Sequence, residues 1–141
     1  MLYNHNNYLL YEVPDNWVVE EDDEVLSIYK PKGKGAITVS FLTALDRDAV
    51  SVPNIGKGAK NFIDQNHVKL DHAMILRTST SDSGTEKKIL SGSGKMPDFY
   101  VKFWIIAQYP KIIRITYLSS KRDKSEEKQC EEIVNSFKFV F

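Results

Sequence analysis

The sequence predicts an α+β protein built on an antiparallel sheet of about six to eight strands, with helices packed on it. Apolar residues alternate along several short segments, which is typical of strands. Two other segments repeat apolar residues every three or four positions, which is typical of amphipathic helices. The order is strands, helix, strands, helix. This order favours antiparallel pairing over a series of βαβ units.

The clearest strand pair lies in the C-terminal half of the chain. One face of its first strand consists of Phe99, Val101, Phe103, Ile105, Ala107 and Tyr109. The other face is mixed, but Trp104 and Ile106 make its middle apolar, so we expect both faces of the sheet to be covered. Pro110 predicts a turn, and residues 112–118 alternate again, which indicates an antiparallel hairpin.

Two helices are predicted, near residues 53–67 and 124–137. The apolar stripe of the first consists of Ile55, Ala59, Phe62 and Ile63. The stripe of the second consists of Cys130, Ile133, Val134 and Phe137. Gly56 and Gly58 weaken the first helix, by about 1 kcal/mol each relative to alanine.

The N-terminal half is also rich in predicted strands. They cover residues 8–13, 17–20, 25–30 and 37–43. Two shorter strands are expected on either side of a polar turn at 79–86. The alternating tail, residues 137–141, predicts a short edge strand.

Length and composition place the chain in a broad class. The 141 residues predict a single domain, residues 1–141. The 19 basic and 19 acidic residues balance, which argues against a partner such as nucleic acid or an anionic membrane. No apolar run reaches the roughly 18–20 residues of a membrane span. The start of the chain lacks a basic segment followed by an apolar one, so we expect a cytoplasmic protein. An exported protein whose signal segment has been removed would look the same.

Two short motifs resemble a known family. Residues 11–17, Tyr-Glu-Val-Pro-Asp-Asn-Trp, resemble the opening strand and Pro-x-x-Trp of PsbP/Mog-like domains. Residues 133–137, Ile-Val-Asn-Ser-Phe, resemble the Ile-x-x-Ser-Phe that ends their final helix. The resemblance covers nearly the whole chain and implies an α/β/α sandwich with a helix on each side of the sheet.

The family includes a photosystem extrinsic subunit, a binder of the small GTPase Ran and many bacterial proteins of unknown function. Most characterised members are binding or accessory proteins. No feature ties this chain to the photosystem or Ran branch, so the resemblance is to an uncharacterised bacterial branch. Because unrelated functions share folds, the resemblance implies little about activity.

Two motifs suggest a phosphate-binding loop and a calcium-binding loop, but each lacks a feature that such a loop needs. Residues 91–95, Ser-Gly-Ser-Gly-Lys, look like a phosphate loop, but Met96 and Pro97 follow, and then a strand. A phosphate loop needs a helix after it, because the dipole at the helix N-terminus attracts the phosphate. A strand follows here instead, so a flexible strand or connection is favoured. The acidic residues 20–24 contain no glycine to bend a calcium loop, and a charged hairpin tip explains them better.

The titratable residues suggest no reaction. His5, His67 and His72 show no spacing that places two of them on one helical face. Cys130 lies on an apolar stripe with no partner base nearby in sequence. The sequence therefore assigns no catalytic, cofactor-binding or metal-binding residue, and we expect no cofactor and no enzymatic activity.

Four residues are candidates for contact with a partner: Trp104, Tyr100, Lys32 and Lys34. Trp104 and Tyr100 share the mixed face of one strand. Either a helix covers this face, which the neighbouring Ile106 favours, or the aromatic side chains are exposed and recognise a partner. Lys32 and Lys34 belong to a charged loop. The favoured interpretation is a non-enzymatic binding or accessory domain that docks a protein partner.

Two alternatives stay open. One is a bacterial immunity or toxin-antagonist protein, which would also be small, charged and poor in cysteine. The other is a small-ligand binder or an enzyme with a pocket between helix and sheet. That alternative predicts a concave pocket with converging polar groups and a shifted pKa.

Overall fold

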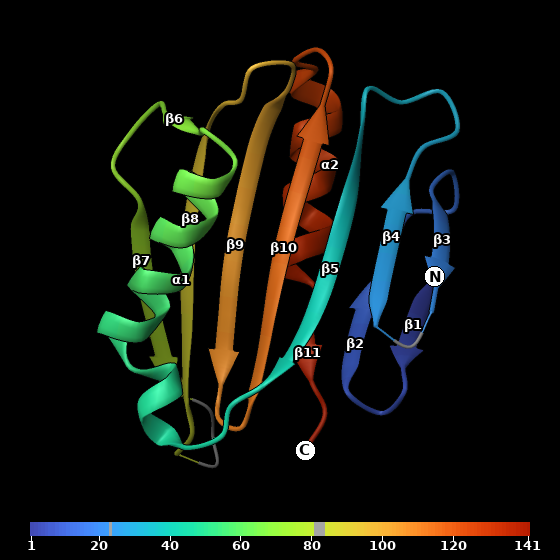
Figure 1. Cartoon of the computed structure of the whole chain (residues 1–141). Coiled ribbons are helices and arrows are strands. Elements are labelled where there is room, and N and C mark those ends of the chain that lie inside the picture. The colour runs from blue at the N-terminus through green and yellow to red at the C-terminus, as the bar shows by residue number, and fades with distance from the viewer. Residues whose placement is uncertain (23, 81–83) are drawn as a thin grey trace.

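The computed structural model describes residues 1–22, 24–80 and 84–141. Its centre is an antiparallel sheet of eight strands in the order β3-β4-β5-β10-β9-β8-β6, with β7 also paired to β8. The strands are β3 (Val18–Glu21), β4 (Val25–Tyr29), β5 (Gly35–Thr43), β6 (Lys69–Leu70), β7 (Ile75–Thr80), β8 (Glu86–Lys95), β9 (Tyr100–Gln108) and β10 (Lys111–Ser119). Helices α1 and α2 lie on opposite sides of this sheet (Figure 1). The α+β class and the sandwich are confirmed.

A second, smaller sheet joins the two ends of the chain. It consists of β1 (Leu2–His5), β2 (Leu9–Glu12) and β11 (Lys138–Phe139). The predicted tail strand therefore exists, but it pairs with β2 rather than with the large sheet. Strand β1 was not predicted, because Leu2-Tyr3-Asn4-His5 shows no clear alternation of apolar and polar residues.

Helix α1 (Val52–Gln65) follows a short 3-10 helix, η1 (Arg47–Val50). Ser51 caps it, because its hydroxyl accepts a hydrogen bond from the Asn54 amide at 3.4 Å. The helix continues through both glycines. It packs its apolar stripe against one face of the sheet, where the buried residues include Ile55, Ala59, Phe62, Val101, Phe103 and Ile105.

Helix α2 (Lys124–Asn135) begins at the cap Asp123, whose carboxylate accepts from the Glu126 amide at 3.0 Å. It covers the opposite face, where the buried residues include Trp104, Ile106, Cys130, Ile133 and Val134. Both helices end two residues earlier than the sequence predicts.

Strand β9 contributes to both cores, as its pattern predicts. Val101 and Phe103 face the α1 side, whereas Trp104 and Ile106 face the α2 side. Phe99 does not continue this strand and is 44% exposed. The reason is a tight turn, in which the Met96 amide donates to the Phe99 carbonyl at 2.7 Å.

The glycine-rich residues 91–95 are the end of β8, so of the two predicted alternatives the strand is confirmed, and no phosphate loop forms there. A methyl group at Gly92 would overlap the ring of Phe103 on the neighbouring strand. The glycine therefore admits an aromatic ring against the backbone. Its role is in packing.

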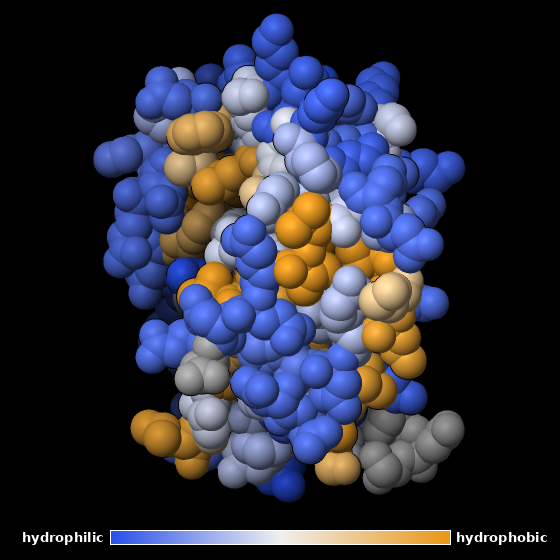
Figure 2. Space-filling view, turned by 90° about the vertical axis from the view of Figure 1, so that its right-hand side faces the viewer, coloured by the Kyte–Doolittle hydropathy of each residue, from blue (hydrophilic) through white to orange (hydrophobic). Residues whose placement is uncertain are grey.

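The acidic residues lie at the connected ends of β3 and β4, which form a hairpin. Glu20 and Glu21 end β3, while residue 23 lies outside the described residues. Asp22 accepts hydrogen bonds from the amides of Glu24 and Val25, at 2.8 and 2.7 Å, and these bonds lower its pKa. Figure 2 views the molecule from the side of this edge, which is largely hydrophilic with hydrophobic residues gathered near its middle.

Candidate functional site

Three hollows follow one flank of helix α2. The first, of about 270 Å³, is lined by Lys102, Arg122, Lys124, Glu127, Lys128 and Glu131. The second, of about 350 Å³, is lined by Ile75, Arg77, Ser91, Trp104, Glu131 and Asn135. The third, of about 640 Å³, is lined by Ser79, Thr80, Lys87, Gln108, Asn135, Ser136, Phe137, Lys138, Phe139 and Phe141. Glu131 and Asn135 each line two hollows, so the three form one groove, the α2 groove.

Regular periodicity places the lining residues on the two walls of the groove. Lys124, Lys128, Glu131 and Asn135 are spaced by three or four residues and therefore share one flank of the helix. Ile75, Arg77 and Ser79 are alternate residues of β7 and share one face of the strand. All six residues of β7 are exposed. The helix thus leaves the β7 side of the sheet open, and the groove lies along that border.

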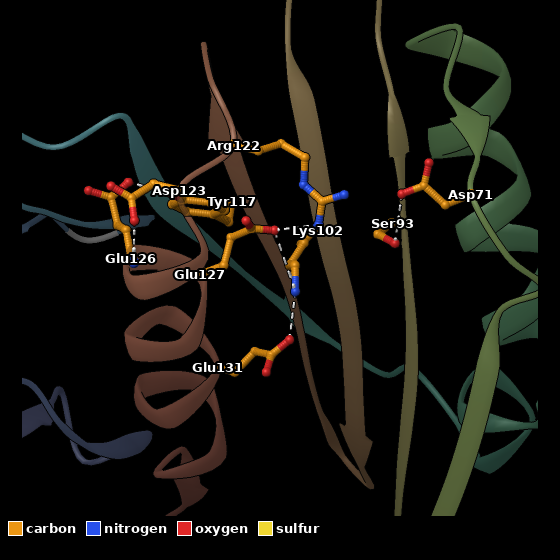
Figure 3. A network of polar contacts seen from close by, with 9 residues as sticks. All are labelled: Asp71, Ser93, Lys102, Tyr117, Arg122, Asp123, Glu126, Glu127 and Glu131. Carbon is orange, nitrogen blue, oxygen red and sulfur yellow. Dashed lines mark hydrogen bonds and ion pairs between the residues drawn. The ribbon is translucent and has the colours of Figure 1, made fainter.

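Ion pairs hold the first part of the groove together (Figure 3). The Lys102 ammonium lies 2.6 Å from Glu131 Oε1 and 3.9 Å from Glu127 Oε1. Arg122 lies 2.9 Å from the same oxygen of Glu127. Oε2 of Glu127 is buried without a hydrogen-bond partner among the described residues. The pairs link α2 to β9 and to the loop before the helix.

The predicted aromatic residues are both buried. Trp104 is 7% exposed and forms part of the floor of the groove, with α2 above it. Tyr100 is also 7% exposed, because the guanidinium of Arg122 lies 4.1 Å from the centre of its ring. The expectation that a helix covers Trp104 is confirmed. The idea of broadly exposed aromatic side chains is wrong, because α2 and Arg122 cover them.

The third hollow contains a half-buried lysine. Lys87 donates from its ammonium to the Phe137 carbonyl at 3.2 Å. Burial, and secondarily the charge of Lys138, lowers the pKa of Lys87. Gln108 is buried at the same hollow. A cation and an amide here converge next to three phenylalanines.

Lys32 and Lys34 lie apart from the α2 groove, on the loop between β4 and β5. Their side chains are exposed and do not line any of the three hollows. The loop is fixed to the first turn of α2, since the amides of Lys34 and Gly35 donate to Glu126 at 3.0 Å. The structure therefore does not bring the two lysines together with Trp104.

The histidines and the cysteine are scattered. His5 is buried and stacks on Phe41, with ring centres 4.5 Å apart, whereas His67 and His72 are exposed. Cys130 is fully buried, and burial raises the pKa of its thiol. Within residues 1–22, 24–80 and 84–141, no group of three or more His, Cys, Asp or Glu could hold a metal ion. No helix in this part of the chain is both long and apolar enough to cross a membrane.

Sequence reasoning missed most of the groove. Arg77, Lys87 and Lys102 come from three different strands and meet only through strand pairing. The one available signal was the helical spacing of Lys124, Lys128 and Glu131. That pattern is also typical of an ordinary solvent-exposed helix face.

At the level of sequence, no family model and no curated protein matches the chain. Among solved structures, the cyanobacterial PsbP (CyanoP) of Synechocystis sp. PCC 6803 superposes with a TM-score of 0.65. The alignment covers 99% of this chain and 91% of that chain, at 12% identity. The chain has the PsbP-like fold.

A protein from Bacteroides thetaiotaomicron VPI-5482 is similar as well, with a TM-score of 0.59 and 14% identity. This alignment covers 98% of the chain but only 47% of the Bacteroides protein. These comparisons confirm the fold expected from the two sequence motifs. At such identities the likeness is one of fold alone, so the α2 groove has to be interpreted from its own chemistry.

Proposed function

We propose that this PsbP-like domain is a non-enzymatic binding or accessory domain that docks an extended segment of a protein partner in the α2 groove. The continuity of the three hollows carries the proposal, because Glu131 and Asn135 join them. From Lys124 to Asn135 the helix rises by about 16 Å. That length suits about five residues of extended polypeptide.

The lining of the groove supports a polypeptide occupant. Protein interfaces combine an aromatic or apolar centre with a polar rim. Here Trp104 lies in the floor of the middle hollow, while Arg77 and Asn135 stand at its sides. The groove therefore offers a small apolar contact surrounded by hydrogen-bonding groups.

A matched pair of variants tests the proposal. Asn135→Trp places a large side chain where two hollows meet, and Asn61→Trp makes the same change on the exposed side of α1. Each protein is used to capture partners from native lysate, and the captured proteins are quantified by mass spectrometry. We expect one protein to be captured by the unaltered chain and by Asn61→Trp but lost with Asn135→Trp. Equal capture by both variants would contradict docking in the groove.

A second candidate function rests on the third hollow. Its volume of about 640 Å³, the buried Gln108 and the ammonium of Lys87 in its lining fit a small anionic ligand. Native mass spectrometry of the purified protein would then show a bound small molecule that is absent from the Lys87→Met variant. An identical spectrum for both proteins would argue against this candidate.

A further inference from the structure

Positive charge is concentrated in the α2 groove, although the chain as a whole has no net formal charge. The described residues that line the first hollow include Lys102, Arg122, Lys124 and Lys128. Arg77 lines the second, and Lys87 and Lys138 line the third. Glu127 and Glu131 are the acidic residues among these linings; both line the first hollow, and Glu131 also lines the second.

The two carboxylates neutralise only part of this charge. Glu127 pairs with Arg122 and Lys102, and Glu131 pairs with Lys102. The other five cations make no ion pair with any residue in the described ranges. Three of them, Arg77, Lys87 and Lys138, line the second and third hollows. An excess of cations along a groove attracts a ligand of opposite charge and raises its rate of association.

The apolar part of the lining favours a polypeptide over a nucleic acid. Ile75 lines the second hollow, and Phe137, Phe139 and Phe141 line the third. A polypeptide segment can place apolar side chains against these residues between its charged ones, as protein interfaces do. Trp104 is only 7% exposed in the floor of the middle hollow, which allows a small side-chain contact but leaves too little of the ring for a base to stack on.

We infer that the segment docked in the α2 groove is acidic, with several aspartate or glutamate side chains in extended conformation. The inference rests on the proposed function and names the chemistry of its partner. Carboxylates of the segment lie against Arg77 and Lys128 in the first two hollows. Further along, they lie against Lys87 and Lys138. Because side chains of an extended chain alternate, every second residue faces the sheet.

Fluorescence anisotropy with a defined probe tests this inference. The probe is a labelled peptide of about eight residues, alternating glutamate and threonine, long enough to fill the groove. Its comparator has glutamine in place of glutamate. The groove variant is Arg77→Glu/Lys128→Glu, and the matched control is Lys57→Glu/Lys60→Glu on the exposed side of α1. All four positions are exposed, and both variants change the net charge equally.

We expect the glutamate peptide to bind the unaltered protein and the α1 control with similar affinity, and the groove variant about tenfold more weakly. Affinity should also fall as salt increases. Equal weakening by both variants, or equal binding of the glutamine peptide, would overturn the inference. Tighter binding of an oligothymidylate of equal charge would overturn it in favour of nucleic acid. If Asn135→Trp abolishes partner capture while the glutamate peptide never binds, docking in the groove stands and its acidic specificity fails.

Discussion

Glu126 is a buried carboxylate whose hydrogen bonds join helix α2 to the loop before β5. It accepts from the amides of Lys34 and Gly35 and from the hydroxyl of Tyr117. A buried carboxylate is tolerated only when such donors replace its water. The position of α2 on the sheet, and therefore one wall of the groove, depends in part on this residue.

A substitution at Gly33 tests whether the position of α2 depends on Glu126. A methyl group there would overlap the Glu126 carboxylate, so Gly33→Ala should lower the free energy of unfolding by about 1–3 kcal/mol. Gly56 is the control, because a methyl group at that position in α1 contacts nothing within 4 Å. Gly56→Ala should raise stability by up to about 1 kcal/mol. Urea denaturation measures both changes, and similar changes in the two variants would contradict the proposed role of Glu126.

We expect the protein to lose stability at alkaline pH because of Tyr117. Burial, reinforced by the bond to Glu126, raises the pKa of Tyr117 above its ordinary value of 10.0. Above pH 10 the unfolded chain therefore releases this proton while the folded protein keeps it. Stability from this group is complete below pH 10 and falls by up to about 1.4 kcal/mol per pH unit above it.

The Tyr117→Phe variant checks the sign of this effect. Its stability should decline less steeply between pH 10 and 11 than that of the unaltered protein. Urea denaturation at closely spaced pH values provides the measurement. A steeper decline in Tyr117→Phe would show that the pKa of Tyr117 is lowered by folding.

At the scale of the element, β8 is the strand that connects the α2 groove to both cores. Lys87 and Ser91 line the groove, and Leu90 is buried on the α1 side. Its glycine at position 92 accommodates the ring of Phe103 on β9. The strand thus depends on one close approach between a backbone and an aromatic ring.

This approach can be tested with a double-mutant cycle. Gly92→Ala should destabilise the protein by about 1–3 kcal/mol, because the new methyl group displaces the Phe103 ring. Phe103→Leu alone should also destabilise. In the double variant the leucine relieves the overlap, so the combined loss should be smaller than the sum of the single losses. Thermal unfolding gives the three values, and strict additivity would contradict the proposed contact.

The elements that alternate or repeat strongly could be predicted from the sequence. Strand β9 shows apolar residues on both faces, and α2 shows an apolar stripe of Cys130, Ile133 and Val134, so both follow from local periodicity. Strands β1 and β6 have only four and two residues and depend on their partners, which local periodicity cannot indicate. For residues 91–95 the sequence leaves a strand and a connection open, because two glycines also suit a loop unless the neighbouring ring of Phe103 is known.

At the scale of the whole molecule, the candidate site depends on the register of strand pairing, which decides which residues of neighbouring strands lie side by side. Arg77, Lys87 and Lys102 belong to β7, β8 and β9, and Lys128 belongs to α2. Antiparallel pairing and the placement of α2 bring these cations to one groove. In the sequence they are mixed with acidic residues, so the chain looks uncharged. A balanced composition therefore concealed a basic groove.

The central claim is that the α2 groove binds an acidic polypeptide. Its most direct test is an NMR titration of ¹⁵N-labelled protein with the glutamate–threonine peptide. We predict amide shift changes along the flank of α2 that carries Glu131 and Asn135, and along β7 around Arg77. The exposed side of α1, including Asn61, should stay unchanged. Changes centred on α1, or spread evenly over the molecule, would contradict the account.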